Sequence, residues 1–498
     1  MNKYAGACLG MIIVLFFSCS TGKNGYSPVK KYPAAVLRND YILLKEVLEN
    51  KHPSLYWYTG KDSMDLYFSR YYDEIKDSMT EQQFAWHIVA PLIDKIHCGH
   101  TSVSMSKGFV KWADKKRFPS FPLFIKVWND TMAVTGNLNQ QDSVFKRGTL
   151  ITSVNGVRNS LQVTRMFNYL PEDGKANNVN FIRLSANFPY YHRNIYGLSK
   201  TYIVTYLDSN NRERTASIPV YTPPKDSVIK DSLAKVDRKK LPRLRSSFQY
   251  RSLVIDSTGT SAVMTLNTFS KGHLRKFFRR SFKKLTDKNI DNLILDIRSN
   301  GGGRVGLSTL LTRYISRYSF KVADSLYAVS RSLNPFTKYI KGNFLNNIEL
   351  AIISRKKADG LYHLRHLENK LYTPRRNIGY KGDVYVLING PTFSAAALFC
   401  NAIKGQPGIL LIGEETGGGW HGNNGIMIPD ITLPNTKIRV RLPLFRLVQY
   451  NHIPKTGTGI IPDIYIGTSY DALIKGYDKK MQVVKDLIRI KSTGQTPL

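Results

Sequence analysis

The sequence predicts a multidomain α/β protein, and three regional patterns support that prediction. Residues 34–110 carry apolar side chains at helical spacing, residues 117–222 carry short β-type runs, and residues 249–498 alternate apolar strands with helical segments. Strands separated by helices predict a partly parallel sheet with helices packed against it. A length of 498 residues allows two to four domains, and a hydrophobic fraction of 42% allows ordinary globular cores.

The first 19 residues predict a targeting segment rather than part of the fold. Lys3 supplies a positive start, Leu9 to Phe17 form an apolar stretch, and Cys19 follows directly. This arrangement resembles a relaxed bacterial lipobox, which implies a lipid on Cys19 and a tether over residues 20–33. We therefore expect an exported protein, anchored by its lipid in the periplasm, at the outer membrane or at the cell surface. An ordinary cleaved signal peptide with an incidental cysteine is the alternative.

Residues 34–110 predict a small helical unit. Apolar residues share one face of its first helix, and Thr80 with Gln83 forms a capping-box pattern ahead of a second amphipathic segment. The unit ends at the sequence HCGHTSVS, residues 97–104.

Residues 117–222 predict a β domain, in which Asn155 and Gly156 mark a tight turn. The stretch KRGTLITSVNGV, residues 146–157, resembles the core motif of PDZ domains, with Thr149 at the position of the usual aspartate. Residues 171–200 look like an insertion within this PDZ-like domain. Residues 223–248 are charged and contain three prolines, and they predict a linker to the third region.

The third region contains a strand, a glycine turn and a helix in NLILDIRSNGGGRVGLSTLL, residues 292–311. Glycines allow a close backbone approach, so their N–H groups can point at an anion. Gly301, Gly303 and Gly306 also satisfy the dinucleotide spacing G-x-G-x-x-G. However, no acidic residue ends a clear second strand, and an exported protein has no ready nucleotide supply. We therefore expect no nucleotide cofactor.

The most informative stretch is VYVLINGPTFSAAALF, residues 384–399, where an apolar strand ends at Asn389-Gly390-Pro391. Ser394 then begins a helix of small residues. The first N–H groups of a helix are unpaired and the helix dipole is positive there, so a developing oxyanion is stabilised. Ser394 is therefore a candidate nucleophile, and the alternative is a simple helix N-cap.

Four segments in order, DIRSNGGG, GPTFSAAALF, LIGEETGGG and GTGIIPDIYI, resemble the tail-specific or C-terminal-processing serine peptidases. The resemblance covers residues 250–490, and the order of the preceding regions matches as well. It implies a ClpP-like or crotonase-like core in a serine-type endopeptidase that needs no cofactor and acts on a peptide or protein. It makes Ser394 the nucleophile. It assigns the oxyanion hole to the N–H of Gly302 together with that of Ala395 or of Ser394 itself.

The general base has two candidates. Tricorn-like members of this family take a histidine from a D-G-H-T motif, and His100 matches it with Cys98 in place of the acid. An imidazole suits this task because it titrates near neutrality. His421, in the glycine loop of residues 417–425, is the competitor, and His97 is a weaker one. A structural histidine remains the alternative for His100.

Other members of the family use a lysine as the base or carry an acidic residue near the C-terminal end of the core. This chain departs from both patterns. No lysine lies between Lys404 and Lys437, so a Ser/Lys dyad is not supported. Tricorn-like members place a glutamate just before the segment GTGIIPD, where this chain has Lys455 and Thr456. Glu414 or Glu415 could orient the histidine or could only fix the loop. Without an orienting acid, the alternative function is a catalytically impaired peptide- or ligand-binding protein on the same scaffold.

Composition bounds the remaining possibilities. The net charge of +36 favours polyanion binding or a solvated basic surface, and because the positive residues are scattered we do not expect nucleic acid as a partner. The basic stretch RKFFRRSFKK, residues 275–284, predicts an amphipathic helix. After the targeting segment, only Cys98 and Cys400 remain, so a disulfide framework is excluded. No C-x-x-C or H-E-x-x-H pattern occurs, and we expect no metal.

Overall fold

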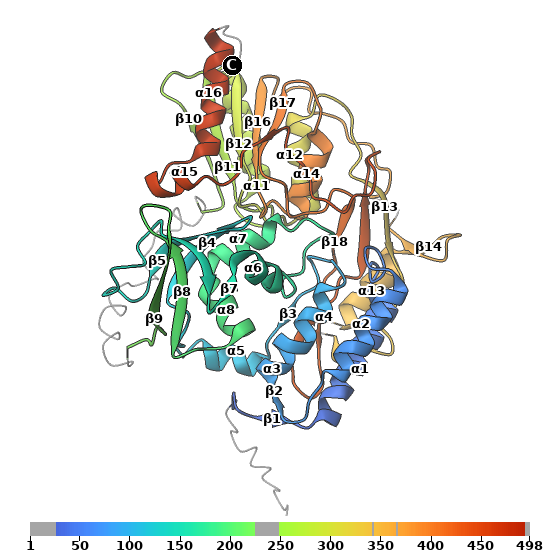
Figure 1. Ribbon diagram of the computed structural model, residues 1–498. Helices are drawn as coiled ribbons and strands as arrows, with labels where there is room; N and C mark the ends of the chain where they lie inside the picture. The colour runs from blue at the N-terminus through green and yellow to red at the C-terminus, as the bar shows by residue number, and fades with distance from the viewer. Residues whose placement is uncertain (1–25, 225–248, 341–342, 365–366, 494–498) are drawn as a thin grey trace, which may run out of the picture.

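The computed structural model describes residues 26–224, 249–340, 343–364 and 367–493 (Figure 1). The predicted targeting segment with Cys19, and most of the predicted linker, lie outside the described residues. Figure 1 shows a sheet with flanking helices at the top, a β-rich unit below it on one side, and helices with a second sheet on the other. Along the part of the chain that is described, no helix is both long and apolar enough to cross a membrane.

The upper sheet belongs to the third region and has six strands in the order β10-β11-β12-β16-β17-β22. The β10–β11 pair is antiparallel and the other pairs are parallel, which confirms the predicted partly parallel sheet. The strands are β10 (Arg251–Ile255), β11 (Ser261–Leu266), β12 (Asn292–Asp296), β16 (Asp383–Ile388), β17 (Ile409–Gly413) and β22 (Ile464–Tyr465).

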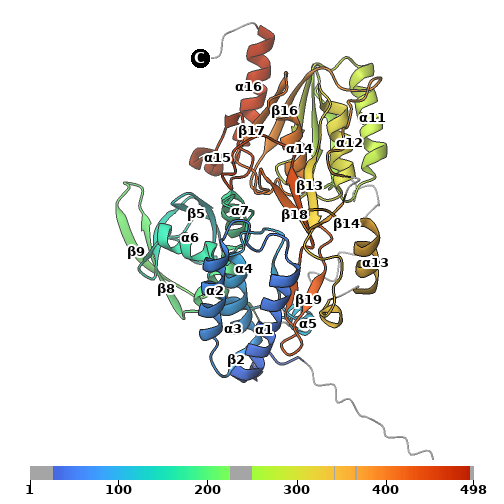
Figure 2. The same cartoon turned by 90° about the vertical axis from the view of Figure 1, so that its right-hand side faces the viewer.

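Helices cover both faces of this sheet (Figure 2). Leu293 and Leu295 of β12 face one core, whereas Ile294 faces the other, because successive side chains of a strand point to opposite sides. The first core is closed by α11 (Leu274–Asp287), α12 (Val305–Ile315) and α14 (Ala395–Ile403), and the second by α16 (Lys479–Thr493).

The sequence predicted two helices of this region, and one of the two predictions is confirmed. Helix α11 is amphipathic as predicted, with Phe277, Phe278 and Phe282 in the core and its basic residues exposed. The amphipathic pattern of residues 468–490 predicts a single capped C-terminal helix, and this prediction is wrong. The segment forms α15 (Tyr470–Lys475) and α16, because Gly476 adopts a left-handed conformation (φ +70°) that ends the first helix.

The β-rich unit holds an antiparallel sheet in the order β4-β5-β6-β8-β9, with β7 against β6. Asn155 and Gly156 form the predicted turn with positive φ angles of 48° and 75°. The predicted insertion contains two helices that pack on this sheet. The strands are β4 (Leu123–Trp128), β5 (Thr131–Asn137), β6 (Leu150–Val154), β7 (Val157–Arg158), β8 (Thr201–Leu207) and β9 (Glu213–Pro219), and the helices are α6 (Asn159–Phe167), α7 (Asn178–Ala186) and α8 (Phe188–Tyr196).

The N-terminal segment is mainly helical. Thr80 and Gln83 exchange both hydrogen bonds of the predicted capping box. The elements are β1 (Lys31–Tyr32), α1 (Ala34–Lys51), α2 (Lys61–Asp73), β2 (Met79–Thr80), α3 (Glu81–Phe84), the π-helix η1 (Ala85–Val89), α4 (Ala90–Asp94), β3 (Val103–Ser104) and α5 (Lys107–Ala113).

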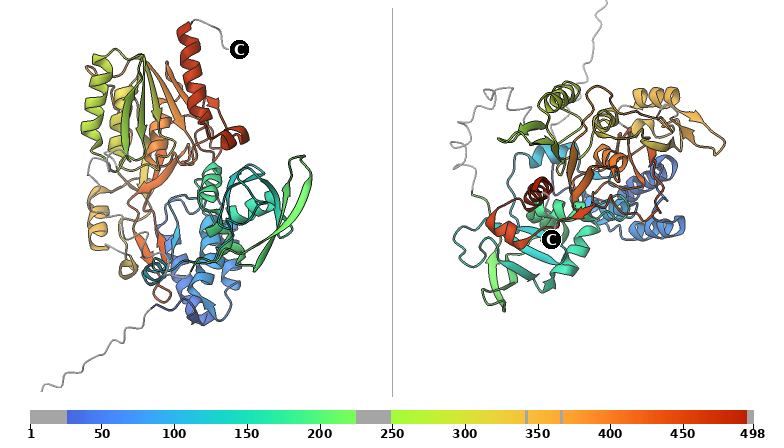
Figure 3. Two further views of the ribbon diagram at one scale, coloured as in Figure 1. Left: turned by 90° about the vertical axis from the view of Figure 1, so that its left-hand side faces the viewer. Right: turned by 90° about the horizontal axis from the view of Figure 1, so that it is seen from above.

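These helices share one hydrophobic core with a second sheet built from the C-terminal half. Figure 3 shows the helices beside the strands of that sheet. Leu44 and Leu48 of α1 belong to the same buried cluster as Phe445 and Leu447 of β21. Strand β3 also pairs with β20, so the two segments are tied by backbone as well. The remaining elements are β13 (Ala323–Ala328), η3 (Thr337–Tyr339), α13 (Asn343–Ile353), β14 (Arg355–Lys356), β15 (Tyr362–His363), β18 (Gly422–Ile426), β19 (Asp430–Thr432), β20 (Arg439–Arg441) and β21 (Phe445–Gln449).

Candidate active site

Ser394 lies at the point where the turn after β16 enters α14. It occupies the N-cap position with φ 53° and ψ −122°, a conformation that a non-glycine residue rarely adopts. Its side chain makes no capping hydrogen bond and is only half-buried. Strain of this kind costs on the order of 1–3 kcal/mol and concentrates at functional sites. A helix-capping role therefore does not explain the conformation of Ser394.

Two glycine turns pack directly against Ser394. A Cβ atom on Gly302 would lie 2.7 Å from Ser394 Cβ and 2.9 Å from Ala395 N, and Gly302 itself has φ +93°. A Cβ on Gly418 would lie 3.1 Å from Ser394 N and 2.6 Å from Ala397 Cβ. Only glycine permits both approaches, so the SNGGG turn and the glycine loop form the walls around the serine.

His100, from the N-terminal segment, lies against the turn that carries Ser394. Its ring packs on Phe393 with a centroid distance of 4.7 Å, and Gly99 lies so close to Phe393 that a Cβ would come within 2.7 Å of that ring. The imidazole is 7% exposed. The loop that follows α4 therefore lies against the turn that carries Ser394.

The two candidate side chains converge beside Gly425 of β18. A Cβ atom built on Gly425 would lie 2.9 Å from Ser394 Oγ and 3.1 Å from His100 Nε2. The two atoms thus face one small space, which the absence of a side chain at Gly425 keeps open. A hydroxyl and an imidazole nitrogen that face one space have the arrangement of a nucleophile beside its general base.

On its other side, His100 faces an acid that the sequence did not point to. His100 Nδ1 is buried without a hydrogen-bond partner among the described residues, and Asp173 Oδ1 lies 3.9 Å from it. Asp173 is 2% exposed and belongs to the predicted insertion. The available signal was the acidic pair Glu172-Asp173 before Gly174, which no spacing rule connects to a distant histidine.

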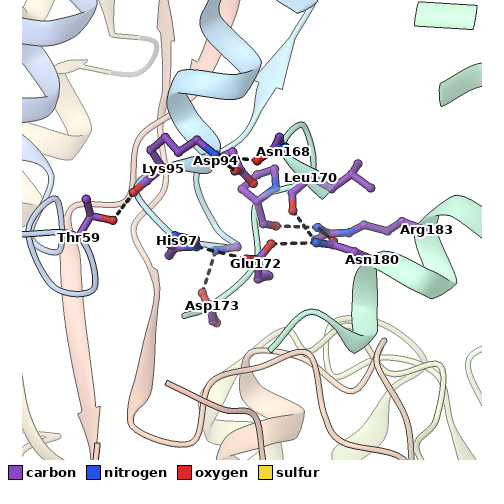
Figure 4. A network of polar contacts seen from close by, with 12 residues as sticks. Thr59, Asp94, Lys95, His97, Asn168, Leu170, Glu172, Asp173, Asn180 and Arg183 are labelled. Carbon is purple, nitrogen blue, oxygen red and sulfur yellow. Dashed lines mark hydrogen bonds and ion pairs between the residues drawn. The ribbon is translucent and has the colours of Figure 1, made fainter. Parts of the chain in front are cut away.

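A polar network attaches the Asp173 loop to the loop that carries His100 (Figure 4). His97 Nδ1 lies 3.2 Å from Glu172 Oε1, and Glu172 Oε2 accepts a hydrogen bond from Asn180 Nδ2 at 2.8 Å. The Gly174 N–H donates to His97 O at 3.0 Å. His97, a weaker candidate base, is therefore engaged in holding the two loops together.

Residues 98 and 424 connect the site to the N-terminal helices. Cys98 is buried and its Sγ accepts a hydrogen bond from Asn424 Nδ2 at 3.0 Å, while Asn424 Oδ1 accepts one from Ser54 Oγ at 2.8 Å. Burial raises the pKa of the Cys98 thiol, so this side chain stays neutral. His52 Nε2 lies 2.8 Å from Thr101 Oγ1, and burial beside Arg446 lowers the pKa of His52 to about 3.

The structure places the other predicted site residues elsewhere. His421 Nε2 lies 3.1 Å from Ile453 O, which engages the ring with the backbone. Glu414 pairs with Lys480 of α16, and Glu415 Oε1 accepts a hydrogen bond from Gly459 N at 2.6 Å. Burial raises the pKa of the Glu415 carboxyl. Neither glutamate is within ion-pair distance of a histidine in the described part of the chain.

Of the two backbone N–H groups predicted to bind the oxyanion, one is already hydrogen-bonded and the other is not, within the part of the chain that the structure describes. The Gly302 N–H donates to Asn300 Oδ1 at 2.9 Å, so an oxyanion would have to share or replace that bond. The Ala395 N–H, the first of α14, has no hydrogen bond to any residue that the structure describes. Among those residues there is also no cluster of three or more His, Cys, Asp or Glu that could hold a metal ion.

Residues 260–466 match the family model of peptidase family S41, within the predicted core region of residues 249–498. No curated protein matches the chain. A solved structure of mature CPAF complexed with lactacystin aligns with 92% of this chain and 98% of its own at 14% identity and a TM-score of 0.62. Mature CPAF aligns with 92% of this chain and 97% of its own, at 14% identity and a TM-score of 0.61. The photosystem II D1 C-terminal processing protease covers 86% of this chain and 93% of its own, at 12% identity and a TM-score of 0.40. The likeness to CPAF extends the shared fold beyond the matched segment to nearly the whole chain.

Proposed function

Because residues 260–466 match the model of peptidase family S41, we propose that this chain is an exported serine endopeptidase with Ser394 as nucleophile and His100 as general base. One observation carries the assignment of residues. Ser394 Oγ and His100 Nε2, from opposite ends of the chain, flank the same point beside Gly425 at 2.9 and 3.1 Å. A serine requires such a base within reach to attack a carbonyl at neutral pH.

The proposed reaction follows the two-step route of acyl transfer. Ser394 Oγ attacks the carbonyl carbon of the scissile bond while His100 Nε2 accepts the hydroxyl proton. The C–N bond then breaks, and the leaving amine takes that proton from Nε2. Water attacks the resulting ester, gives one proton to Nε2, and the proton returns to Oγ as the new carboxyl product leaves. Every proton is balanced without a cofactor.

Charge on the tetrahedral oxygen is the second requirement. The unpaired Ala395 N–H begins α14 directly after Ser394, so it and the positive end of the helix dipole are available to an oxyanion that develops there. Gly302, which packs on Ser394 and Ala395, is the proposed second donor once its bond to Asn300 is shared. Losing one such donor typically lowers kcat by about 10²–10³-fold.

The proposed substrate is an extended peptide or an unfolded protein. A cavity of about 540 Å³ lies between the N-terminal helices and the β-rich unit, and its wall includes Gly99, the neighbour of His100. Aromatic side chains such as Trp86, Tyr169 and Tyr191 line it, which suits apolar substrate side chains. We further propose that the β-rich unit is PDZ-like and takes up chain ends. A lipid on Cys19 would hold the enzyme at a membrane surface.

Ser394→Ala should lower cleavage of a fluorescently labelled unfolded protein by at least about 10³-fold without changing the thermal unfolding midpoint. A fluorophosphonate probe should label the wild type and not the variant. His100→Ala should lose far more activity than His421→Ala, which serves as the matched histidine control. Full turnover in Ser394→Ala would eliminate the nucleophile. A wild type that neither cleaves nor labels, yet retains peptide, would instead indicate a binding protein.

A further inference from the structure

We propose that Asp173 is the positioning carboxylate for His100, supplied by the insertion of the β-rich unit rather than by the peptidase domain. The inference rests on the proposed function, because a positioning acid matters only if His100 acts as a base. Asp173 would hold the imidazole with Nδ1 protonated and Nε2 free toward Ser394, and would stabilise the imidazolium formed during attack.

The first support is the match between an unsatisfied donor and a buried acid. A buried polar atom without a partner costs about 1–3 kcal/mol, and His100 Nδ1 is such an atom. Among the described residues, Asp173 is the one acidic residue within 4 Å ion-pair distance of His100, with its Oδ1 3.9 Å from Nδ1. The gap exceeds a hydrogen bond, but catalytic hydrogen bonds are often long in unliganded sites and shorten when substrate binds.

The second support is that the carboxylate is fixed from both sides. Asp173 Oδ1 accepts a hydrogen bond from the Gly99 N–H at 2.8 Å, and Oδ2 accepts one from the Gly419 N–H at 3.4 Å. The loop beyond it is held too, since the Lys175 N–H donates to Gly457 O at 2.7 Å. Asp173 thus touches both the loop that carries His100 and the glycine loop beside Ser394 (Figure 4 shows its bond to the former).

The third support comes from the other groups around His100, none of which can replace Asp173. Cys98 on the same loop is a buried thiol whose pKa is raised by burial. His52, beyond Thr101, is kept neutral by burial and by the charge of Arg446. Tyr58, beside Asp173, has a pKa raised by burial. β18 contributes the uncharged Asn423 and Asn424, and the Ser394 turn contributes no charge.

The segment before GTGIIPD offers no substitute either. Lys455 Nζ donates to Trp57 O at 2.7 Å, so this position holds a cation fixed on the N-terminal loop. The acid therefore reaches the site from a different part of the chain. Three regions meet in one constellation: His100 from the N-terminal segment, Asp173 from the β-rich unit and Ser394 from the peptidase domain.

Asp173→Asn tests the role, because an amide oxygen can still accept the Gly99 N–H and preserve the loop. We expect kcat to fall by about 100-fold or more with little change in KM. The acidic limb of the pH profile of kcat/KM should move to lower pH, because a nearby negative charge favours the protonated imidazole. Asp173→Glu keeps the charge, and should recover part of the lost kcat and hold the limb near its wild-type position.

Glu172→Gln is the matched control, one residue away in the same loop. It breaks the contact with His97 and should lower the thermal midpoint while leaving kcat within about threefold and the acidic limb in place. If Asp173→Asn behaves like this control, Asp173 is only structural and the inference is overturned.

A readout without turnover separates this inference from the proposed function. In the ¹⁵N NMR titration of the His100 ring, the midpoint should be lower in Asp173→Asn than in the wild type. An unchanged midpoint overturns the pairing even if the enzyme is active, and a lowered midpoint supports it even if no peptide is cleaved. Should the variant not fold, a downfield Nδ1 proton of His100 in the wild type at low pH supports the pairing, and its absence overturns it.

Discussion

The side chains of Ser394 and His100 can face one another because glycines beside them carry no side chain. Ser394 carries the strained backbone, but the meeting of Oγ with His100 Nε2 depends on Gly425, which has no Cβ to occupy the gap. Gly302 and Gly418 play the same part behind the serine. The chemistry proposed for two residues therefore depends on at least three glycines, whose role is the backbone approach that they permit.

Gly425→Ala should abolish most activity while leaving the fold intact. The added methyl carbon would lie 2.9 Å from Ser394 Oγ and 3.1 Å from His100 Nε2, closer than carbon atoms approach such groups, so one side chain must leave its position. We expect kcat/KM to fall by about 100-fold or more, because small misplacements of reacting groups cost this much. Gly306→Ala, with open space around its new methyl, is the control. Wild-type kinetics in Gly425→Ala would contradict the arrangement.

Among the elements, the short helix α4 and the loop of residues 168–175 hold the candidate base in place. Asp94 ends α4, is buried, and lies 3.0 Å from Lys95 Nζ, which also donates to Asn168 Oδ1 at 2.9 Å. Burial raises the pKa of the Asp94 carboxyl to about 6, although Lys95 opposes the shift. Docking of the β-rich unit on α4 therefore includes a carboxyl that is costly to ionise.

This carboxyl predicts a specific pH dependence of stability. Unfolded Asp94 loses its proton near pH 4, whereas the folded group keeps it until about pH 6. Between these values the folded state binds more protons, so the free energy of unfolding falls as pH rises from about 4 to about 6. Asp94→Asn should remove this fall and be the more stable form at pH 7 by up to about 3 kcal/mol. Urea unfolding at several pH values measures it, and parallel curves for the two proteins would refute it.

For the molecule as a whole, the important feature is a core shared between the N-terminal helices and residues 320–447. Helices α1 to α4 bury their apolar faces against β13, β18 and β21, so the predicted helical unit does not have a core of its own. The region of residues 260–466, which the S41 family model matches, shares that core and so also packs against the N-terminal segment. The candidate base His100 arrives on the same segment, which links completion of the fold to completion of the site.

Residues 249–498 alone should therefore fail to form a native domain. Their second sheet would expose Leu442, Phe445 and Leu447, which are buried in the whole chain. We expect strong binding of a hydrophobic dye, weak near-ultraviolet circular dichroism and no cooperative thermal transition. Residues 26–498 provide the control. A cooperative transition in the fragment would show that its sheet is stable without the helices.

Local pattern was enough to predict several elements of this protein. The apolar strand and breaker before Ser394, the capping box at Thr80 and the apolar face of α11 all follow from side chains within one or two turns of each other. Local signals predicted one further helix only in part. The C-terminal helix was interrupted at Gly476, where a glycine could end the helix or continue it.

The sequence by itself determined the strand–turn–helix that presents Ser394 and the glycines around it, because periodicity and turn chemistry act between neighbours. Only the tertiary structure decided that His100 rather than His421 faces that serine, that Asp173 lies behind His100, and that the N-terminal helices share a core with residues 320–447. These contacts join residues far apart in the chain, and their energies depend on packing that no local pattern records.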